Sequence, residues 1–282
     1  MIYIVIPVYN RWKYTQACIE SLNKQIYKDF KIIVVDDGSS DGTSEKINDL
    51  YPNVHVIKGD GNLWWTGGIN EGIKYALSQK ADYVLSLNND TLTYPGYLQE
   101  LINAAEKKPN SLIGSLAVDS ETKKELYAAG FIKWYVDKYT DLLNDLGNDD
   151  KKGIHEVGFF PGRGLLIPKQ VFDKVGLFDQ KTFPHYMADY DFTLTAKKNG
   201  FKTYCCLEAK LGVYIDASGA HDIFSNKTFK NYKEHLFGMK GAGNLPLFYK
   251  YVIRHCPTLE IIPCITIGTL KRLTNYWLKK EL

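Results

Sequence analysis

The sequence predicts an α/β protein with a mostly parallel central sheet flanked by helices and a helical extension at the C-terminal end. Short apolar runs alternate with helix-length amphipathic segments through the first 110 residues, which is the spacing of βαβ units. Polar or acidic side chains follow these runs directly, as in the segment Asn88–Asp90. With 282 residues, 45% of them hydrophobic, the chain is long enough for a substantial core.

The first half is expected to hold four buried strands with helices between them. Each strand is a short apolar run bounded by polar or turn residues, and the runs are Ile2–Ile6, Lys31–Val35, Val54–Ile57 and Tyr83–Leu87. The helices carry apolar residues at helical spacing, and their ranges are Tyr14–Gln25, a short helix from an Asp41 N-cap to Leu50, Ile69–Gln79, and a helix opened by Pro95 that ends near Lys108.

The second half is less regular. Its expected strands are Ser111–Val118, Leu126–Ile132, Val157–Phe160, Gly164–Ile167, Phe201–Leu207 and Gly212–Ile215. Its expected helices are Lys169–Val175, Ala188–Asn199, Lys227–Lys240, Leu245–Cys256 and Ile262–Lys280. The polar, acidic stretch Trp134–His155 is expected to be an excursion or flexible loop.

The distribution of charge and the cysteine content indicate which partners and which cellular compartment to expect. From Ile223 onward there are 10 Lys/Arg and 3 Asp/Glu, a net charge of +7, so the first 222 residues carry −4 of the overall +3. A basic tail of this kind suits membrane phospholipid or a phosphate-bearing substrate, and no motif points to nucleic acid. The five cysteines show no zinc spacing and are expected to be reduced, which favours the cytoplasm. Met1 leads straight into a strand, so no signal peptide is expected, nor a membrane span.

Four loops follow the expected strands, and the carboxyl ends of parallel strands meet at one edge of a sheet. The loops are 7–10, 36–41, 59–68 and 88–90. Asp90 beside Asn88 and Asn89 suits a hard divalent cation that bridges to phosphate, with a polar turn as the alternative. Asp36 or Asp37 would accept hydrogen bonds from a base or ribose, with turn formation and helix capping as the alternative.

These motifs, taken in order, resemble a known family. Pro7-Val8-Tyr9-Asn10, the run from Asp36 to Thr43, and Asn88-Asn89-Asp90 are similar to the family 2 glycosyltransferases with a GT-A fold. The stretch 62–72 resembles their glycine-rich loop and helix. The stretches 175–179 and 185–191 resemble the bacterial rhamnosyltransferase-like branch, which builds O-antigens and capsules. The match runs from about Ile2 to His221.

The resemblance implies a site for a nucleotide-sugar donor. Donor contacts are expected from Pro7, Tyr9, Asn10, Asp37, Gly68, Asn88, Asn89 and Arg163. Asp37 would meet the uracil or thymine edge, and the glycines beside Arg163 would let its backbone approach phosphate or acceptor, with plain surface solvation as the alternative. Asp90 and His221 would bind Mn²⁺ or Mg²⁺, although a structural role is open for His221. Asn88 stands where many members have aspartate, which leaves one motif carboxylate.

The catalytic base implied by the resemblance is Asp189, with Asp191 in reserve. A carboxylate within hydrogen-bond reach of an acceptor hydroxyl can take its proton during attack on the anomeric carbon. Ala188 replaces the glutamate that precedes this aspartate in the family. Helix capping is the alternative role for Asp189.

Aromatic side chains are expected to form the acceptor site. Trp64, Trp65 and Tyr186 would offer a platform to a sugar ring, with core packing as the alternative. In the tail, the stripe Leu270, Leu273 and Trp277 between basic residues suits an interfacial helix at a membrane. Packing on the catalytic domain, or a homodimer contact, fits the same stripe.

Residues 1–222 would thus be a catalytic domain, with a nucleotide-binding half (1–110) and an acceptor-binding half (111–222), followed by an extension (223–282). The expected activity is inverting transfer of a sugar from dTDP-rhamnose or a UDP-hexose to a glycan or lipid-linked acceptor of the bacterial surface. The rivals are a non-catalytic nucleotide-sugar binder and a sugar-phosphate nucleotidyltransferase. A nucleotidyltransferase would show a glycine-rich loop with a basic residue where Pro7-Val8-Tyr9-Asn10 stands.

Overall fold

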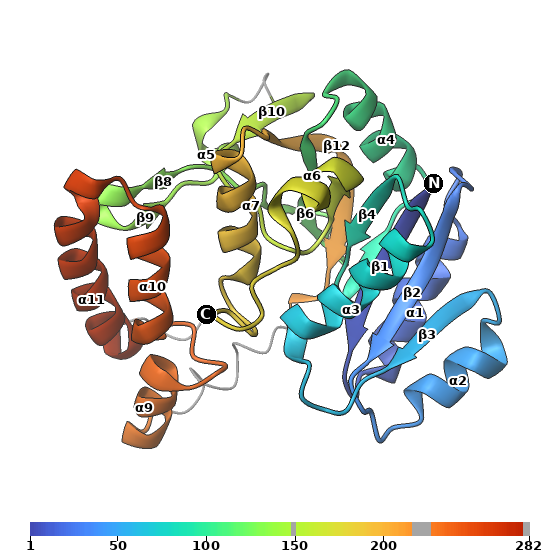
Figure 1. The fold of residues 1–282 in the computed structure, drawn as a ribbon, viewed down its shortest axis with the longest axis horizontal. Helices are drawn as coiled ribbons and strands as arrows, with labels where there is room; N and C mark the ends of the chain where they lie inside the picture. The colour runs from blue at the N-terminus through green and yellow to red at the C-terminus, as the bar shows by residue number, and fades with distance from the viewer. Residues whose placement is uncertain (148–150, 216–226, 279–282) are drawn as a thin grey trace.

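The computed structural model describes residues 1–147, 151–215 and 227–278, and its first half is a parallel sheet (Figure 1). The strands are β1 (Ile2–Val8), β2 (Phe30–Asp36), β3 (Val54–Lys58) and β4 (Tyr83–Ser86). They lie in the order β4-β1-β2-β3, and every neighbouring pair is parallel. In the β1–β2 register Val8 pairs with Asp36, so these two strands end level with each other.

Helices cover both faces of this sheet because β1 is apolar on both faces. Ile2, Ile4 and Ile6 pack in the core under the first and fourth helices, whereas Tyr3 and Val5 pack under the third. The helices are α1 (Trp12–Asn23), α2 (Thr43–Leu50), α3 (Trp64–Ser78) and α4 (Tyr97–Lys107). The predicted elements are confirmed with small shifts at their ends, except that α3 begins five residues earlier than expected, and that Gly42 occupies the N-cap position of α2.

The second half of the sheet is mixed, so the expectation of a mostly parallel sheet holds for the first half only. Strand β11 (Leu165–Pro168) runs antiparallel to both β4 and β6 (Leu112–Asp119). The two strands expected over 201–215 are one strand, β12 (Thr203–Val213), which is parallel to β6 and irregular between Cys206 and Lys210. The remaining strands of this sheet are β5 (Thr91–Thr93), β7 (Glu125–Tyr127) and β10 (Ile154–Val157).

The stretch Trp134–His155 is more ordered than its polar composition suggested. It contains the turn η1 (Trp134–Val136) and the second strand, β9 (Lys138–Tyr139), of a short hairpin whose first strand, β8 (Ile132–Lys133), comes just before it. It then contains α5 (Leu142–Asp145) and the start of β10. The hairpin is held by the C-terminal helices: Arg272 Nη1 lies 2.6 Å from Asp137 Oδ2, and Lys271 donates to the carbonyls of Val136 and Asp137. These partners are more than 130 residues away, beyond the reach of a local pattern.

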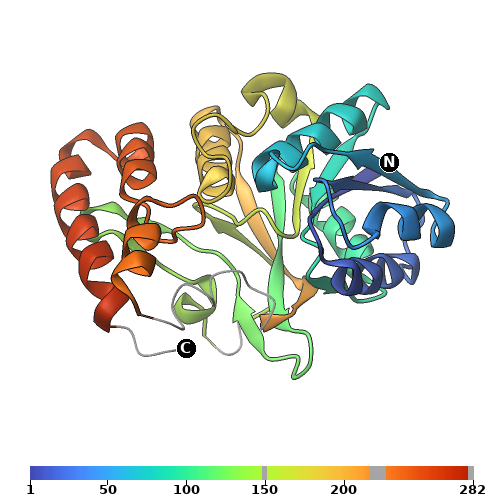
Figure 2. The same cartoon turned by 90° about the horizontal axis from the view of Figure 1, so that it is seen from below.

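The C-terminal helices gather at the end of the molecule opposite β3, as Figures 1 and 2 both show. They are α9 (Phe229–Phe237), α10 (Leu245–His255), the turn η4 (Thr258–Glu260) and α11 (Ile261–Leu278). Between them and the sheet lie α6 (Lys169–Val175) and α7 (Ala188–Lys198), and α10 contacts α7. No helix in the described ranges has the length and apolar character needed to cross a bilayer. The five cysteines are free thiols, as predicted. The predicted domain boundary at 222 falls outside the described residues.

Candidate active site at the carboxyl ends of the strands

The four loops expected to converge are joined by hydrogen bonds. Asn10 accepts from the backbone N–H of Ser40 (2.7 Å), which links the loops after β1 and β2. Asp37 accepts from the backbone N–H of Gly61 (2.9 Å), which links β2 to β3. Trp65 Nε1 donates to Asn88 Oδ1 (2.9 Å), which links the start of α3 to the loop after β4. The prediction that these segments meet at one edge of the sheet is confirmed.

The paired acids after β2 have separate tasks within the fold. Asp36 is buried and accepts from the Ser39 N–H (3.0 Å) and the Ser44 hydroxyl, so it shapes the turn into α2. Asp37 holds the following loop instead, through the N–H of Gly61 and that of Trp64 (3.0 Å). The turn-forming alternative therefore describes Asp36. Each carboxylate oxygen of Asp37 can accept a second hydrogen bond. The predicted contact of Asp37 with the nucleobase of the donor therefore stays a prediction.

Asp90 forms an ion pair with Arg11 that was not predicted from the sequence. Arg11 Nη1 is 3.1 Å from Asp90 Oδ2, and the Asp90 side chain is 13% exposed. The other oxygen, Oδ1, is buried and has no hydrogen-bond partner among the residues that the structure describes. Burial raises the pKa of Asp90, while Arg11 and Arg163 act in the opposite direction. Arg11 directly follows the Pro7–Asn10 motif in the sequence. A single arginine at the start of a helix is too common to predict an ion pair with a residue 79 positions away.

Asp189 lies at the start of α7 with its carboxylate fixed by backbone donors. The Gly162 N–H donates to Oδ2 at 2.8 Å, and the Tyr190 N–H donates to Oδ1 at 2.9 Å. Burial raises the pKa of Asp189, and the Arg163 charge acts against that shift. A Cβ at Gly162 would overlap the Trp65 ring and approach the Asp189 Cβ to 3.3 Å. Asp189, Gly162 and Trp65 therefore pack as one unit, and Trp65 in turn bonds to Asn88.

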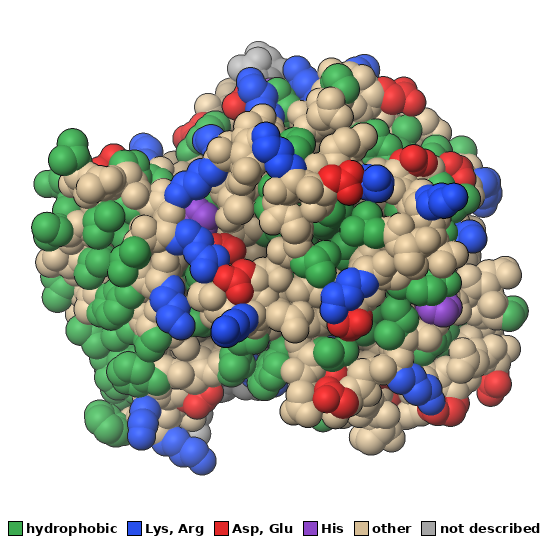
Figure 3. All heavy atoms as spheres, in the orientation of Figure 1, with side chains coloured by type: hydrophobic (Ala, Val, Ile, Leu, Met, Phe, Trp, Pro, Cys, Tyr) green, Lys and Arg blue, Asp and Glu red, His purple; other side chains and the backbone are tan. Residues whose placement is uncertain are grey.

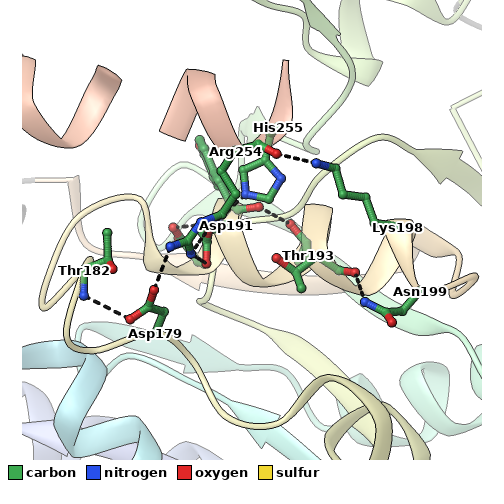
Figure 4. Close-up of polar contacts among 11 residues, drawn as sticks. Asp179, Thr182, Asp191, Thr193, Lys198, Asn199, Arg254 and His255 are labelled. Carbon is green, nitrogen blue, oxygen red and sulfur yellow. Dashed lines mark hydrogen bonds and ion pairs between the residues drawn. The ribbon is translucent and has the colours of Figure 1, made fainter. Parts of the chain in front are cut away.

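Asp191 is turned toward the C-terminal helices instead (Figure 4). Its side chain is 4% exposed and lies 2.9 Å from Arg254 Nη1 and 2.8 Å from His255 Nε2. Arg254 also reaches Asp179 Oδ2 at 2.9 Å. Both Asp191 oxygens are thus occupied by partners on α10, and the geometry leaves Asp189 as the better-placed candidate base.

A sequence profile of glycosyl transferase family 2 matches residues 3–175, which is more than half of the chain. The chain belongs to the family 2 glycosyltransferases.

Similar proteins agree with this assignment. An uncharacterized glycosyltransferase of Rickettsia typhi is 29% identical over 199 residues, covering 68% of this chain and 57% of that relative. The glycosyltransferase GlyG of Streptococcus pneumoniae is 26% identical over 212 residues, covering 70% of this chain and 66% of GlyG. The crystal structure of TarS from Staphylococcus aureus superposes with a TM-score of 0.56 at 16% identity, over 91% of this chain and 44% of TarS. The fold is therefore of the GT-A type, and the chain spans little more than half the length of the Rickettsia relative.

The aromatic residues predicted for the acceptor of this glycosyltransferase have different surroundings. Trp64 is 37% exposed, and its ring lies 5.8 Å from that of His185, which in turn lies 4.7 Å from Tyr186. Trp65 packs edge-on against Phe178 at 5.7 Å, in line with the core-packing alternative. Burial, with the Lys240 charge, lowers the pKa of His185 to about 4, so this ring is neutral near pH 7. Trp64 at the surface and the partly buried His185 and Tyr186 form one aromatic group.

The other predicted donor residues divide into exposed and structural ones. Tyr9 is 59% exposed, whereas the Asn89 side chain is buried and donates to the Thr15 hydroxyl at 3.0 Å. A Cβ at Gly68 would lie 3.0 Å from the Cβ of Pro7, so the glycine allows α3 and β1 to pack closely here. His221 lies outside the described residues. The predicted contacts of these residues with a donor stay predictions.

The described residues do not make a complete site for a divalent cation. Asp90 offers one unpartnered oxygen, but its other oxygen pairs with Arg11, and Asn88 Oδ1 accepts from Trp65. In the described part of the chain no three His, Cys, Asp or Glu side chains come together as metal ligands. The need for Mn²⁺ or Mg²⁺ stays a prediction that depends on His221.

Proposed function

We propose that this glycosyltransferase is an inverting enzyme in which Asp189 is the general base. The observation that carries the proposal is the fixed position of the Asp189 carboxylate, 2.8 Å from the Gly162 N–H and packed against Trp65, which bonds to the loop that ends in Asp90. This places a candidate base next to the segment that the family resemblance assigns to the donor diphosphate.

In the proposed reaction an acceptor hydroxyl attacks the anomeric carbon of the donor sugar as Asp189 takes its proton. The bond to the nucleoside diphosphate breaks on the opposite face, so one displacement inverts the anomeric configuration. The raised pKa that burial gives Asp189 makes its carboxylate a stronger base than an exposed aspartate.

We propose dTDP-rhamnose as the first donor to test and a UDP-hexose as the second, with a glycan or lipid-linked acceptor in bacterial surface polysaccharide synthesis. The support is the resemblance of the stretches 175–179 and 185–191 to the rhamnosyltransferase-like branch. A non-catalytic nucleotide-sugar binder is the second candidate, because Asn88 and Ala188 stand where the family has acids.

Contact with a membrane surface through the C-terminal helices is also part of the proposal. Large apolar side chains there are strongly exposed, including Leu259 (94%), Ile262 (78%) and Leu270 (57%). Figure 3 shows hydrophobic side chains over this end of the molecule, with a column of Lys and Arg beside them. An apolar face next to basic side chains suits an anionic lipid surface.

The experiment that tests the base is Asp189→Asn, with sugar transfer and donor-nucleotide affinity measured separately. Transfer should fall by about 10²–10⁴-fold, the usual contribution of a general base, while nucleotide affinity stays unchanged. The matched control is Asp173→Asn, an exposed aspartate on α6 that should retain full activity.

The pH profile provides a second test of Asp189. A general base must be deprotonated, and burial raises the pKa of Asp189. As the pH is lowered, kcat/KM should therefore begin to fall at a pH above about 4, the ordinary pKa of an aspartate. Transfer by Asp189→Asn near the wild-type rate would refute the assignment, and wild-type binding without turnover of any donor would favour the non-catalytic binder.

A further inference from the structure

Positive charge gathers at the position that the proposed function assigns to the donor diphosphate. The motif that has two acids in many relatives has one here, Asp90, because Asn88 is neutral. Two arginines, Arg11 and Arg163, both act on Asp90 electrostatically. Each guanidinium group carries a positive charge, opposite in sign to a diphosphate, beside the single carboxylate of this motif.

We propose that Arg11 and Arg163 bind the diphosphate of the donor directly, and that they supply the positive charge that a complete acidic metal site would otherwise recruit. The inference rests on the proposed function, since it concerns the donor of that same reaction. It adds Arg11 to the donor site and gives the two arginines a shared role.

Arg11 is held at the edge of the sheet by its own backbone and by Asp90. It occupies the N-cap position of α1, directly after Asn10, whose backbone N–H donates to Ser39 Oγ (2.8 Å). The ion pair with Asp90 uses Nη1, and the Arg11 side chain is still 34% exposed. A guanidinium group carries five N–H donors in a planar fork that matches phosphate oxygens, so an arginine oriented by a carboxylate can also bind an anion.

Arg163 lies on a loop that is anchored on both sides of it: the Gly162 N–H donates to Asp189 Oδ2 (2.8 Å), and the Gly164 N–H donates to the carbonyl of Ser86 at the end of β4 (2.8 Å). The Arg163 charge acts on both Asp90 and Asp189. Within the described ranges its guanidinium makes no hydrogen bond or ion pair. Both neighbours of Arg163 need to be glycine: Gly164 has a φ of +75°, and a Cβ at Gly162 would overlap the Trp65 ring. A partly buried arginine whose guanidinium has no protein partner in the described ranges, on a loop held by backbone hydrogen bonds, suits an anionic ligand.

Because Asn88 is neutral, it attracts a metal ion less strongly than an aspartate would, and arginines can supply the positive charge that the diphosphate needs. The Asn88 Oδ1 accepts the indole N–H of Trp65 at 2.9 Å, so this oxygen is already engaged within the protein. Asp90 Oδ2 is engaged with Arg11. Of these oxygens, Asp90 Oδ1 alone has no partner among the described residues, so they offer a divalent cation a single ligand, whereas two guanidinium groups can bind the diphosphate directly.

The test is the affinity of the full chain for UDP and dTDP, measured by calorimetry in EDTA and again with Mn²⁺. Wild type should bind one of the two in EDTA. Arg11→Met and Arg163→Met should each weaken binding in EDTA by about tenfold or more, as expected for loss of a charge-assisted hydrogen bond, and Arg11→Lys should lose less. Lys13→Met, on the same helix, is the matched control and should bind as wild type does.

The outcomes separate this inference from the function it rests on. Binding by wild type only when Mn²⁺ is present, or equal binding by wild type and both Arg→Met variants, would overturn the role of the arginines and leave the donor site intact. Absence of UDP and dTDP binding by wild type under both conditions would overturn the proposed function and this inference with it. If Arg11→Met does not fold, Arg163→Met and Arg11→Lys carry the same comparison.

Discussion

Replacing Gly162 with alanine tests whether the candidate base and the loop 88–90 are joined in one packed unit through Trp65. The new Cβ would come closer than 3.0 Å to two carbon atoms of the Trp65 indole, whereas ordinary van der Waals contact begins at 3.4 Å. The ring must therefore move by at least several tenths of an ångström. That movement would disturb its hydrogen bond to Asn88 and crowd Asp189, whose Cβ would lie 3.3 Å from the new methyl group.

The expected cost of Gly162→Ala combines overpacking with a weakened hydrogen bond. Overpacking of a well-packed site costs about 1–3 kcal/mol, and a typical hydrogen bond contributes about 1 kcal/mol. We expect a loss of about 2 kcal/mol in the free energy of unfolding, since the indole is partly exposed and can relax outward. Transfer should fall further than stability, by about tenfold or more, because a small displacement of a catalytic carboxylate strongly reduces its efficiency.

Thermal unfolding and sugar transfer measured on the same samples test both parts. A loss of about 2 kcal/mol should lower the midpoint by roughly 4–8 °C in a protein of this size. The matched control is Gly96→Ala, at φ −89° with no atom within 4 Å of the added Cβ, and it should change stability by less than about 0.5 kcal/mol. If Gly162→Ala is as stable and as active as Gly96→Ala, Trp65, Gly162 and Asp189 do not form a packed unit.

Two further predictions concern the C-terminal helices. Arg254→Met should lower the free energy of unfolding by about 2 kcal/mol, because it removes a partner of the buried Asp191. The expected loss is smaller than for a fully buried ion pair, since the Arg254 side chain is 38% exposed. Lys169→Met, in an exposed pair with Asp173, should cost under about 0.5 kcal/mol, and equal midpoints for the two variants in denaturant titrations would contradict the prediction. Ile262→Glu with Leu270→Glu should weaken partition onto vesicles of anionic phospholipid by about tenfold or more, because each side chain loses roughly 1.5–3 kcal/mol of apolar burial. Ile26→Glu, at an equally exposed site on another part of the surface, is the control, and unchanged partition with a concentration-dependent dimer would assign the apolar face to a second copy.

The first half of the protein could be predicted well from the sequence, because its signals are local. Buried parallel strands appear as short apolar runs, so Ile2, Lys31, Val54 and Tyr83 lie at or within one residue of the observed starts of β1 to β4. The loops that follow meet at one edge because parallel strands end there together. The motifs in those loops identified the family that the profile match then showed.

The second half was harder to predict because long-range contacts determine it. The hairpin of β8 and β9 is ordered by Arg272 and Lys271 on α11, and β11 enters the sheet antiparallel between strands from other parts of the chain. Neither feature has a periodic pattern of its own. For the same reason, the polar stretch Trp134–His155 was predicted to be a loop, although its η1 turn packs on α11 and its last residues pair with β12.

By itself the sequence determined the α/β class of the first half, the four loops at the sheet edge and the set of candidate acids. Tertiary structure decided which acid does what. Asp36 shapes a turn, Asp191 binds α10, Asp90 pairs with Arg11, and Asp189 is left beside Gly162 with a raised pKa. The physical reason is that the role of a carboxylate depends on its partners and its burial, and these come from residues distant in the chain.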